Sequence, residues 1–367
     1  MSRIISSPSK YIQGKNELSK LRTYTSLLSN QNVYAIVDPF ILNIYEAEIN
    51  SSYEGHTNKI HIRKFNGECS RNEIDSIIND INEKKCTVVV GIGGGKTLDT
   101  AKAVAFYLDY PVVIVPTLAS SDAPCSALSV IYTNDGIFDK YLPLRKNPDI
   151  VLVDTSVITN APAKFLIAGI GDALATYFET RACYNSQSIN SVGGICSLSA
   201  LALAKRCFEV LLEDGLKAKY AVQSKSCSQA VENIIEANTY LSGIGFESGG
   251  LAAAHAVHNG LTVLKETHKM LHGEKVAFGT LVQLALENAP KAEIDTVINF
   301  CKEVGLPTTL HELGITDISA ERIMKVAVAS CAPDDTMKNM PFKVIPEEVF
   351  SAIMIAHNLG INHHSTC

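Results

Sequence analysis

Residues 87–102 read Thr-Val-Val-Val-Gly-Ile-Gly-Gly-Gly-Lys-Thr-Leu-Asp-Thr-Ala-Lys, and this stretch decides the fold. The unbroken β-branched run from Thr87 to Val90 predicts a strand that is buried on both faces of a sheet. Glycines at 91, 93, 94 and 95 follow, and helical spacing then begins with Ala101, Val104, Ala105 and Leu108. Strand, glycine turn and helix suit phosphate binding, because glycines admit a phosphate to the backbone and the helix N–H groups attract its charge.

Two standard nucleotide-binding fingerprints come close to this turn, and neither fits. The G-x-G-x-x-G pattern starting at Gly91 needs a glycine where Lys96 stands. The Walker pattern ending at Thr97 needs a glycine where Val90 stands. A tight turn that uses several glycines only for its own backbone is the structural alternative. The stretch therefore predicts a phosphate-binding turn of neither standard type.

The segments around this turn alternate short apolar runs with helical patterns, which is typical of a mostly parallel sheet built from βαβ units. Strands are expected at 33–37, 61–65, 112–115 and 150–153, and a helix is expected at 72–83. Residues 128–142 should form a hairpin around Thr133-Asn-Asp-Gly136. Pro162 should begin the next helix, with Asn160 as its cap.

After residue 160 the strand patterns end, and Ala- and Leu-rich amphipathic segments take over. Helices are expected near 201–215 (closed by Gly215), 224–243, 250–264, 274–288, 291–304, 320–330 and 347–358. At 367 residues the chain exceeds the length that one core usually fills. We therefore predict a Rossmann-like α/β dinucleotide-binding domain over residues 1–160 and an all-helical metal- and substrate-binding domain over 161–367.

Composition excludes several classes of function. The net charge of −6 gives no electrostatic reason to bind nucleic acid or an anionic membrane. The ten cysteines form no C-x-x-C pair, which indicates free thiols in a reducing compartment rather than disulfides or a cysteine metal site. The N-terminus lacks the apolar core of a signal peptide. We expect a cytoplasmic protein without a nucleic-acid or membrane partner.

Two segments at strand ends are candidates for the cofactor site. Asp38 follows the strand 33–37, where an acid can accept hydrogen bonds from a ribose 2′-OH and repel a 2′-phosphate. It can equally cap the helix that follows. The loop 116–124 leaves the carboxyl end of the strand 112–115, at the edge where ligands bind in open α/β sheets.

Four of the ten histidines, at 255, 258, 268 and 272, fall within eighteen positions. His255 and His258 have i, i+3 spacing on one predicted helix, while His268 and His272 lie at i, i+4 around a predicted helix break. Two imidazoles and a carboxylate hold a metal while leaving a position for substrate. Asp172, in Gly169-Ile-Gly-Asp-Ala173, offers the carboxylate at an expected helix start. Spacing alone leaves the pairs 255/258, 255/272 and 268/272 open.

Five stretches in order resemble the iron- and zinc-dependent polyol dehydrogenases, and the resemblance extends over essentially the whole chain. They are GIGGGKTLD at 91–99, PTLASSDAPCSALSVIY at 116–132, GIGDA at 169–173, ESGGLAAAHAVHNG at 247–260 and LHGEKVAFG at 271–279. The resemblance implies a dehydroquinate synthase-like architecture, in which a dinucleotide domain and a helical domain enclose the active site. Because known members often form octamers, it also implies a homo-oligomer.

The same resemblance assigns roles to individual residues. Asp172, His255 and His272 would be the metal ligands, of Zn²⁺ or alternatively Fe²⁺, with His258 behind them and His268 on the surface. Asp122 would hold the substrate hydroxyl beside the nicotinamide and act with the three ligands in catalysis. The implied NAD contacts are Asp38, Gly93, Gly94, Gly95, Lys96, Asp99, Thr117, Ser120, Ser126, Leu128 and Tyr132.

The implied activity is the reversible oxidation of glycerol to dihydroxyacetone by NAD⁺, with other vicinal diols as further substrates. A catalytic metal lowers the pKa of bound water from about 15.7 to about 7. A comparable effect on a diol is worth on the order of 10 kcal/mol, which no ordinary side chain supplies. Asp38 favours NAD over NADP.

Two rival functions fit parts of this pattern. Enzymes of the same architecture act on phosphate-bearing substrates, which need a clamp of Lys and Arg, and Lys265, Lys269 and Lys275 lie near the metal motifs. A sensor that binds NAD without catalysis would keep the glycine turn but has no use for an open metal site. The Pro-containing segment 331–342 is a candidate lid.

Overall fold

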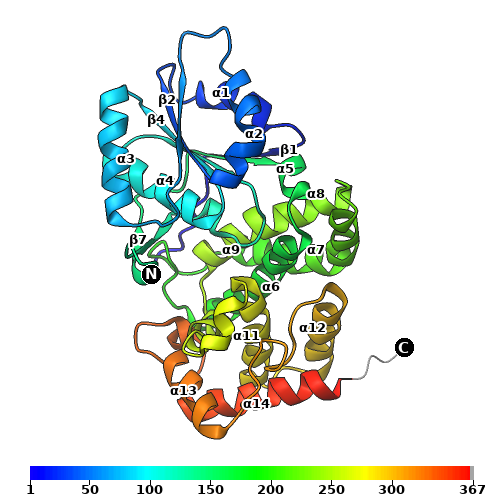
Figure 1. Ribbon diagram of the computed structural model, residues 1–367. Coiled ribbons are helices and arrows are strands. Elements are labelled where there is room, and N and C mark those ends of the chain that lie inside the picture. The colour runs from blue at the N-terminus through cyan, green and yellow to red at the C-terminus, as the bar shows by residue number, and fades with distance from the viewer. Residues whose placement is uncertain (364–367) are drawn as a thin grey trace.

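A computed structural model describes residues 1–363, and its N-terminal part is built on one six-stranded sheet (Figure 1). The strand order is β1-β8-β5-β4-β2-β3, and every neighbouring pair is parallel. The strands are β1 (Lys10–Gly14), β2 (Val33–Val37), β3 (Ile60–Lys64), β4 (Val88–Gly93), β5 (Val112–Pro116) and β8 (Ile150–Asp154). The five strands expected from the sequence, at 33–37, 61–65, 87–90, 112–115 and 150–153, are confirmed as β2, β3, β4, β5 and β8. The edge strand β1 was not expected, because its apolar run is short and polar residues interrupt it.

Helices cover both faces of this sheet, as the unbroken apolar strands require. Val33, Ala35 and Val37 of β2 pack toward α1 and α2, while Tyr34 and Ile36 point to the opposite face, toward α3 and α4. The second of these cores continues without interruption into the helical part of the chain. The helices of this region are η1 (Leu18–Lys20), α1 (Leu21–Thr25), α2 (Pro39–Ser51), α3 (Arg71–Lys84), α4 (Gly95–Leu108) and α5 (Thr155–Asn160).

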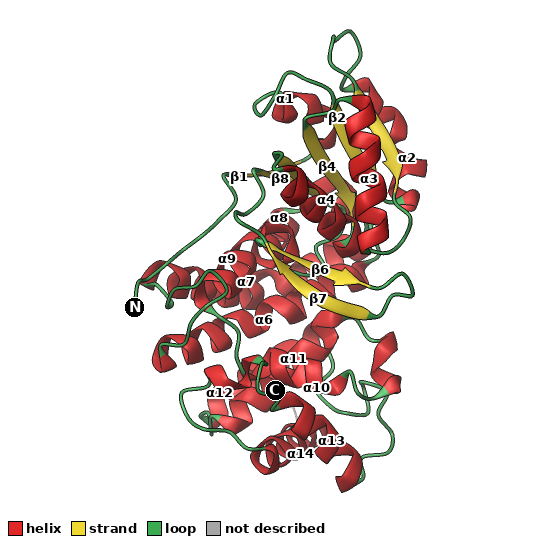
Figure 2. Cartoon of the chain, turned by 90° about the vertical axis from the view of Figure 1, so that its left-hand side faces the viewer, coloured by secondary structure: helices red, strands yellow, loops and turns green. Residues whose placement is uncertain are grey.

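The expected hairpin forms a separate two-stranded sheet. Strands β6 (Leu128–Tyr132) and β7 (Phe138–Pro143) pair in antiparallel fashion around the turn at residues 133–136. The hairpin lies at the level between the large sheet and the helical region (Figure 2). The short helix η2 (Ala123–Cys125) precedes it, and hydrogen bonds from this loop to Asp172 and Asn238 place the chain between β5 and β6 against the helical region.

After β8 the described chain contains helices and no further named strand, which confirms the predicted fold class. The helices are α6 (Ala163–Ser186), α7 (Leu198–Gln223), α8 (Gln229–Glu236), the π-helical turn η3 (Ala237–Leu241), α9 (Ser242–Gly249), α10 (Ala253–Leu261), η4 (Lys265–Lys269), α11 (His272–Leu286), α12 (Lys291–Val304), α13 (Ala320–Ser330), η5 (Thr336–Asn339) and α14 (Pro346–Asn362). The division into two domains at residue 160 stays a prediction.

Three local expectations were wrong for identifiable reasons. Gly91 and Gly93 belong to β4 and Gly95 to α4, so only Gly94 stands between strand and helix. Asn160 ends α5 instead of capping α6, because Asp154 caps that short extra helix through the N–H groups of Ser156 and Val157. Gly215 does not close α7, and a Cβ there would meet the Phe300 ring at 2.9 Å.

Two features bear on the expected cellular setting. Each helix among residues 1–363 is too short or too polar to cross a lipid bilayer. Nine cysteines are free thiols, and the tenth, Cys367, lies outside the described residues.

Candidate active site and metal centre

Three helices bring Asp172, His255 and His272 together. Asp172 lies in the middle of α6, His255 lies in the first turn of α10, and His272 is the first residue of α11. The expectation that Asp172 stands at a helix start was wrong. The glycines beside it serve close helix packing instead, because a Cβ at Gly171 would lie 2.3 Å from the carbonyl oxygen of Gly273. The backbones of α6 and α11 therefore touch beside both ligand candidates.

The side chains converge on one carboxylate oxygen. Asp172 Oδ1 lies 3.0 Å from His272 Nε2 and 3.4 Å from His255 Nε2. These three atoms are mutually within 4.8 Å. Although it is buried and close to both rings, Asp172 Oδ1 accepts no hydrogen bond from any described group. The imidazole of His272 is 41% exposed, so solvent and small molecules can reach the centre.

The hydrogen bonds behind His255 decide which of its nitrogens carries a proton. His255 Nδ1 lies 2.7 Å from the carboxylate oxygen Oε2 of Glu179 and must donate to it, because a carboxylate only accepts. Glu179 is fully buried on α6, seven residues after Asp172, and its other oxygen accepts the N–H groups of Ala252 and His255. A neutral His255 therefore turns the lone pair of Nε2 toward Asp172.

A longer chain of hydrogen bonds does the same for His272. Asn259 Nδ2 donates to the two carboxylate oxygens of Asp335 at 3.2 and 3.0 Å, so its Oδ1 accepts from His258 Nδ1 at 3.0 Å. A neutral His258 then accepts at Nε2, which lies 3.0 Å from His272 Nδ1. His272 must donate there, and the lone pair of its Nε2 faces Asp172. When both imidazoles are neutral, two nitrogen lone pairs and the Asp172 carboxylate face one place with no hydrogen between them.

The electrostatics of this place favour positive charge. Burial favours the neutral acid at Asp172, but the two imidazoles outweigh burial and hold the pKa of its carboxyl well below the usual range. Burial opposes a charged His255, yet Glu179 and Asp172 raise the pKa of this imidazole well above its usual value. Burial lowers the pKa of His258 well below the usual value, which keeps it neutral. A divalent cation fits the donor set of one carboxylate and two imidazoles, with a side open to solvent.

Asp122 lies directly against this centre. Its backbone N–H donates to Asp172 Oδ2 at 3.2 Å, and its own Oδ2 accepts from the hydroxyl of Ser242 at 2.7 Å. Burial and the neighbouring Asp172 raise the pKa of the Asp122 carboxyl well above its usual range. A carboxyl with a raised pKa beside a reacting hydroxyl can hold or pass on a proton.

His268 and the candidate lid 331–342 are the two remaining predicted features near the centre. His268 is exposed and bonds the carbonyl oxygen of Thr262, away from Asp172. The candidate lid 331–342 is tied to the segment before α10, since Thr336 and Asn339 donate to the carbonyl oxygens of Ala252 and Leu251.

The predicted cofactor residues gather at the carboxyl edge of the sheet. Strands β2 and β4 are parallel neighbours there, and the chain continues from β2 to β3 on one side and from β4 to β5 on the other, which makes this the topological switch point of the sheet. Asp38 follows β2, and a Cβ at Gly93 would lie 2.9 Å from the Cβ of Asp38. Asp38 caps α2 through Oδ1, which accepts from Phe40 and Ile41, and this use leaves Oδ2 for a ribose.

The remaining predicted cofactor residues differ in burial and in whether their side chains already have a partner within the protein. Lys96 Nζ donates to both carboxylate oxygens of Glu68 at 2.6 and 2.7 Å and lies over the Tyr132 ring. Asp99 is buried and accepts the N–H of Val130, and burial raises its pKa to about 6. Gly95 is exposed at the start of α4, beside the half-buried Gly94. Ser120 and Leu128 are half-buried, while Thr117 and Ser126 are buried in the loop.

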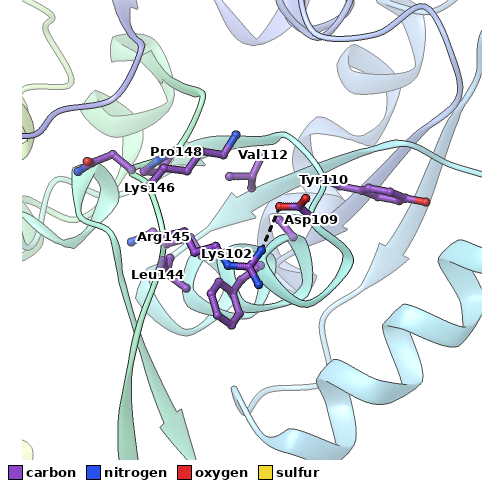
Figure 3. A pocket seen from close by; sticks show the side chains of 11 residues that line it. Lys102, Asp109, Tyr110, Val112, Leu144, Arg145, Lys146 and Pro148 are labelled. Atoms are coloured by element: carbon purple, nitrogen blue, oxygen red, sulfur yellow. Dashed lines mark hydrogen bonds and ion pairs between the residues drawn. The ribbon is translucent and has the colours of Figure 1, made fainter.

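A separate cavity lies behind α4, between its C-terminal end and the segment 144–148 (Figure 3). Its lining includes Lys102, Tyr110 and the exposed ion pair between Arg145 and Asp109. Its volume of about 40 Å³ suits a few water molecules and not a dinucleotide. It is therefore no alternative to the sheet edge as the cofactor site.

Sequence reasoning missed several residues that support the centre. Glu179 has a readable signal, because a spacing of seven places it two turns from Asp172 on the same helix face. Ser242, Asn259 and Asp335 have none, since small polar residues at such positions are common on any helix or loop. Only the folded chain brings them to the site.

Comparisons with known proteins agree with this architecture. The model of the family described as iron-containing alcohol dehydrogenase matches residues 8–155. Glycerol dehydrogenase of Citrobacter freundii is 50% identical over 98% of both chains. Glycolaldehyde reductase of Halobacterium salinarum is 43% identical over 98% of both. The crystal structure of glycerol dehydrogenase from Schizosaccharomyces pombe is 39% identical and superposes with a TM-score of 0.94, covering 98% of this chain and 91% of that one.

The resemblance to polyol dehydrogenases is thereby confirmed. Because the identity extends over nearly the full length of both chains, the similarity belongs to the whole protein and not to one shared segment. The chain belongs to the iron-containing alcohol dehydrogenase family and, within it, to the glycerol dehydrogenases.

Proposed function

We propose that this protein catalyses the reversible oxidation of glycerol by NAD⁺. Glycerol gives a hydride from its secondary carbon to NAD⁺ and a proton to solvent, and the products are dihydroxyacetone, NADH and H⁺. The observation that carries the proposal is the convergence of Asp172, His255 and His272 on a buried oxygen that accepts no hydrogen bond. Relatives named glycerol dehydrogenase at about half identity support the substrate.

The proposed ligands Asp172, His255 and His272 would hold Zn²⁺, with Fe²⁺ as the alternative. Bound there, the ion supplies a Lewis acid that lowers the pKa of an alcohol hydroxyl. Glu179 and His258 keep the two rings in the tautomer that presents Nε2. Asp122, held by Ser242, orients the substrate hydroxyl and takes part in moving its proton.

NAD⁺ would bind at the switch point between β2 and β4. The start of α4 offers free N–H groups beside Gly94 and Gly95 for the phosphates. Asp38 Oδ2 would accept from the adenosine ribose and disfavour the 2′-phosphate of NADP. Lys96, Asp99, Thr117, Ser120, Ser126, Leu128 and Tyr132 would line the rest of the site.

The glycolaldehyde reductase relative favours a second candidate, reduction of a small hydroxyaldehyde by NADH at the same centre. The phosphate-substrate alternative has less support. Of the three lysines that were candidates for a clamp, Lys265 and Lys269 are exposed on η4, and only Lys275 is buried. A neutral diol or hydroxyaldehyde suits these surroundings better than a phosphate.

Assembly into a homo-oligomer, possibly an octamer, is a further part of the proposal. Ile5, Ile189 and Leu198 expose 46%, 61% and 61% of their surfaces, and an interface between copies would cover apolar side chains of this kind. Light scattering coupled to size exclusion measures the mass. A cytoplasmic location stays a prediction from the sequence.

The decisive experiment measures NAD⁺ reduction with glycerol at mildly alkaline pH on chelator-stripped protein, before and after zinc or ferrous iron is added. We expect activity to vanish with the metal and to return with it. Parallel assays use glycerol phosphate with NAD⁺, and glycolaldehyde with NADH. Full activity in the chelator-stripped, metal-free protein would overturn the proposed centre, and a preference for the phosphate would overturn the proposed substrate.

A further inference from the structure

The loop 117–128, which carries four proposed NAD contacts, is held in place by the helical run η3–α9. Asn238 Nδ2 donates to the carbonyl oxygen of Ala119 at 3.0 Å, and Ser242 bonds Asp122 as described above. Glu247 reaches furthest along the loop, where its Oε1 accepts the backbone N–H of Ala127 at 2.5 Å. These contacts tie a loop of the sheet region to one helical segment of the metal-binding region.

Glu247 is a buried carboxylate whose partners are all uncharged. It is 2% exposed, and its second oxygen accepts from Asn147 Nδ2 at 2.5 Å. Asn147 also donates to the carbonyl oxygen of Cys125 at 2.9 Å and accepts from the hydroxyl of Ser6. Glu247 thus holds the loop at two points, directly at Ala127 and through Asn147 at Cys125. A buried carboxyl group that is hydrogen-bonded only to uncharged groups is expensive to retain, which argues for a specific task.

A buried cation holds the same short segment from the other side. Lys102 of α4 donates from Nζ to the carbonyl oxygens of Ala123 and Leu128, at 2.6 and 3.1 Å. Its side chain is fully buried and lies 3.8 Å from the Asp99 carboxylate. Two side chains therefore fix the backbone between Ala123 and Leu128. Lys102 donates to two of its carbonyl oxygens, and Glu247 accepts one of its N–H groups. Ser126 and Leu128 belong to this hydrogen-bonded segment.

We propose that Glu247 is a positioning residue for the dinucleotide, acting from the helical region through the backbone of residues 125–128. By holding Ala127 and Cys125, it sets the place of Ser126 and Leu128 before NAD⁺ arrives, so that binding does not have to order the loop. The inference rests on the proposed function, because the contact of this loop with NAD is itself proposed. It concerns a residue that forms no hydrogen bond with Asp172, His255 or His272.

The test compares Glu247→Gln with the wild-type holoenzyme. The amide places one N–H₂ where an oxygen stood, so it opposes the donor of either Ala127 or Asn147 while keeping the size of the side chain. We expect the Kd for NADH, measured by nucleotide fluorescence, to rise about tenfold, and KM for NAD⁺ to follow. The Kd for zinc, from chelator competition, and KM for glycerol should stay within about twofold of wild type.

Glu236→Gln is the matched control, because Glu236 is exposed at the end of α8, directly before the run η3–α9, and its side chain accepts no hydrogen bond among the described residues. Its NADH affinity should equal that of wild type. Hydrogen exchange adds a readout specific to positioning. Amides of 123–128 should exchange faster in the nucleotide-free Glu247→Gln protein, and saturating NADH should remove the difference.

The outcomes separate the two proposals. A wild-type protein that binds no NADH overturns the proposed function. A wild-type protein that binds NADH, with Glu247→Gln binding equally well, overturns the role of Glu247 alone. If NADH affinity, zinc affinity and melting temperature all fell together, the role of Glu247 would also be overturned, because such a result indicates general destabilisation. If Glu247→Gln does not fold, Asn147→Ala replaces it, and we expect a severalfold rise in Kd from loss of the link to Cys125.

Discussion

The centre at Asp172, His255 and His272 is built from charged and polar side chains, whereas the turn at Gly93–Gly95 offers a ligand little except backbone. In the centre each ring has a separate partner that fixes its orientation, Glu179 for His255 and His258 for His272. In the turn the geometry comes from the end of one strand and the first N–H groups of one helix. A single substitution in the centre should therefore abolish most of the activity, whereas a single substitution in the turn should weaken nucleotide binding only in part.

The largest expected effect tests the side-chain centre. Asp172→Asn keeps the size of the side chain but removes the charge that the two imidazoles face. We expect turnover with glycerol and added zinc to fall by about 10³-fold or more, because the remaining ligands cannot hold the Lewis acid. NADH affinity, measured by fluorescence, should change less than about threefold. Full activity in a zinc-saturated Asp172→Asn protein would remove Asp172 from the centre.

The next effect distinguishes the two ring supports. Glu179→Gln replaces a charged acceptor behind His255, whereas His258→Gln replaces a neutral one behind His272. Loss of a supporting residue typically lowers metal affinity 10- to 100-fold, and charge-assisted bonds are about twice as strong as neutral ones. We expect Glu179→Gln to lie near about 100-fold and His258→Gln near about 10-fold in zinc Kd. Chelator competition measures both, and the reverse order would contradict the assigned hydrogen-bond directions.

Two glycine substitutions test the backbone site. A Cβ at Gly93 would lie 2.9 Å from the Cβ atoms of Asp38 and Thr97, at a φ of +157°, so Gly93→Ala should cost about 1–3 kcal/mol of unfolding free energy. A Cβ at Gly95 meets nothing within 4 Å, and Gly95→Ala should keep or slightly raise stability. If a phosphate approaches this backbone, Gly95→Ala should still weaken NADH binding about tenfold.

Denaturant melts and NADH titrations of both glycine variants complete the test. Weakened binding without lost stability in Gly95→Ala would assign that glycine to a ligand. Unchanged binding would assign it to the turn alone.

The smallest effect concerns Asp38. Asp38→Asn retains a good helix cap, so stability should change by less than about 0.5 kcal/mol. Without the carboxylate charge, the ratio of kcat/KM for NAD⁺ to that for NADP⁺ should fall severalfold. A ratio that does not move would make Asp38 a cap only.

The sequence predicted the sheet region well because its signals are local. Val88–Val90 and Ile150–Val153 are apolar runs that suit only buried parallel strands, and the glycine turn marked the edge at which a cofactor would bind. The metal pair was not decidable by the same means. His255, His258 and His272 differ only in which way a folded helix points them, and that depends on the packing of α10 against α11.

The errors have a common cause. Gly169, Gly171 and Gly215 looked like helix ends, because a glycine weakens an isolated helix. In the folded protein each lies inside a long helix at a point where another part of the chain approaches closely. The partner in that approach is distant in sequence, so local patterns carry no trace of it. For the same reason Glu247 and Asp335, although they lie in segments singled out above, received no role of their own, and both are anchored by contacts between distant segments.

The contact of α6 with α11 has a consequence for the choice of ion. A Cβ at Gly273 would lie 1.8 Å from the carbonyl oxygen of Ala168, and one at Gly171 would lie 2.3 Å from that of Gly273. No side chain stands between the two backbones at these glycines, so rotamer changes of intervening side chains cannot adjust the distance between the backbones of Asp172 and His272. Widening the centre for a cation of larger radius would require two packed helices to move apart, and protein interiors resist such compression and expansion. The glycine contacts between α6 and α11 thus limit how far the proposed centre can widen for a larger ion.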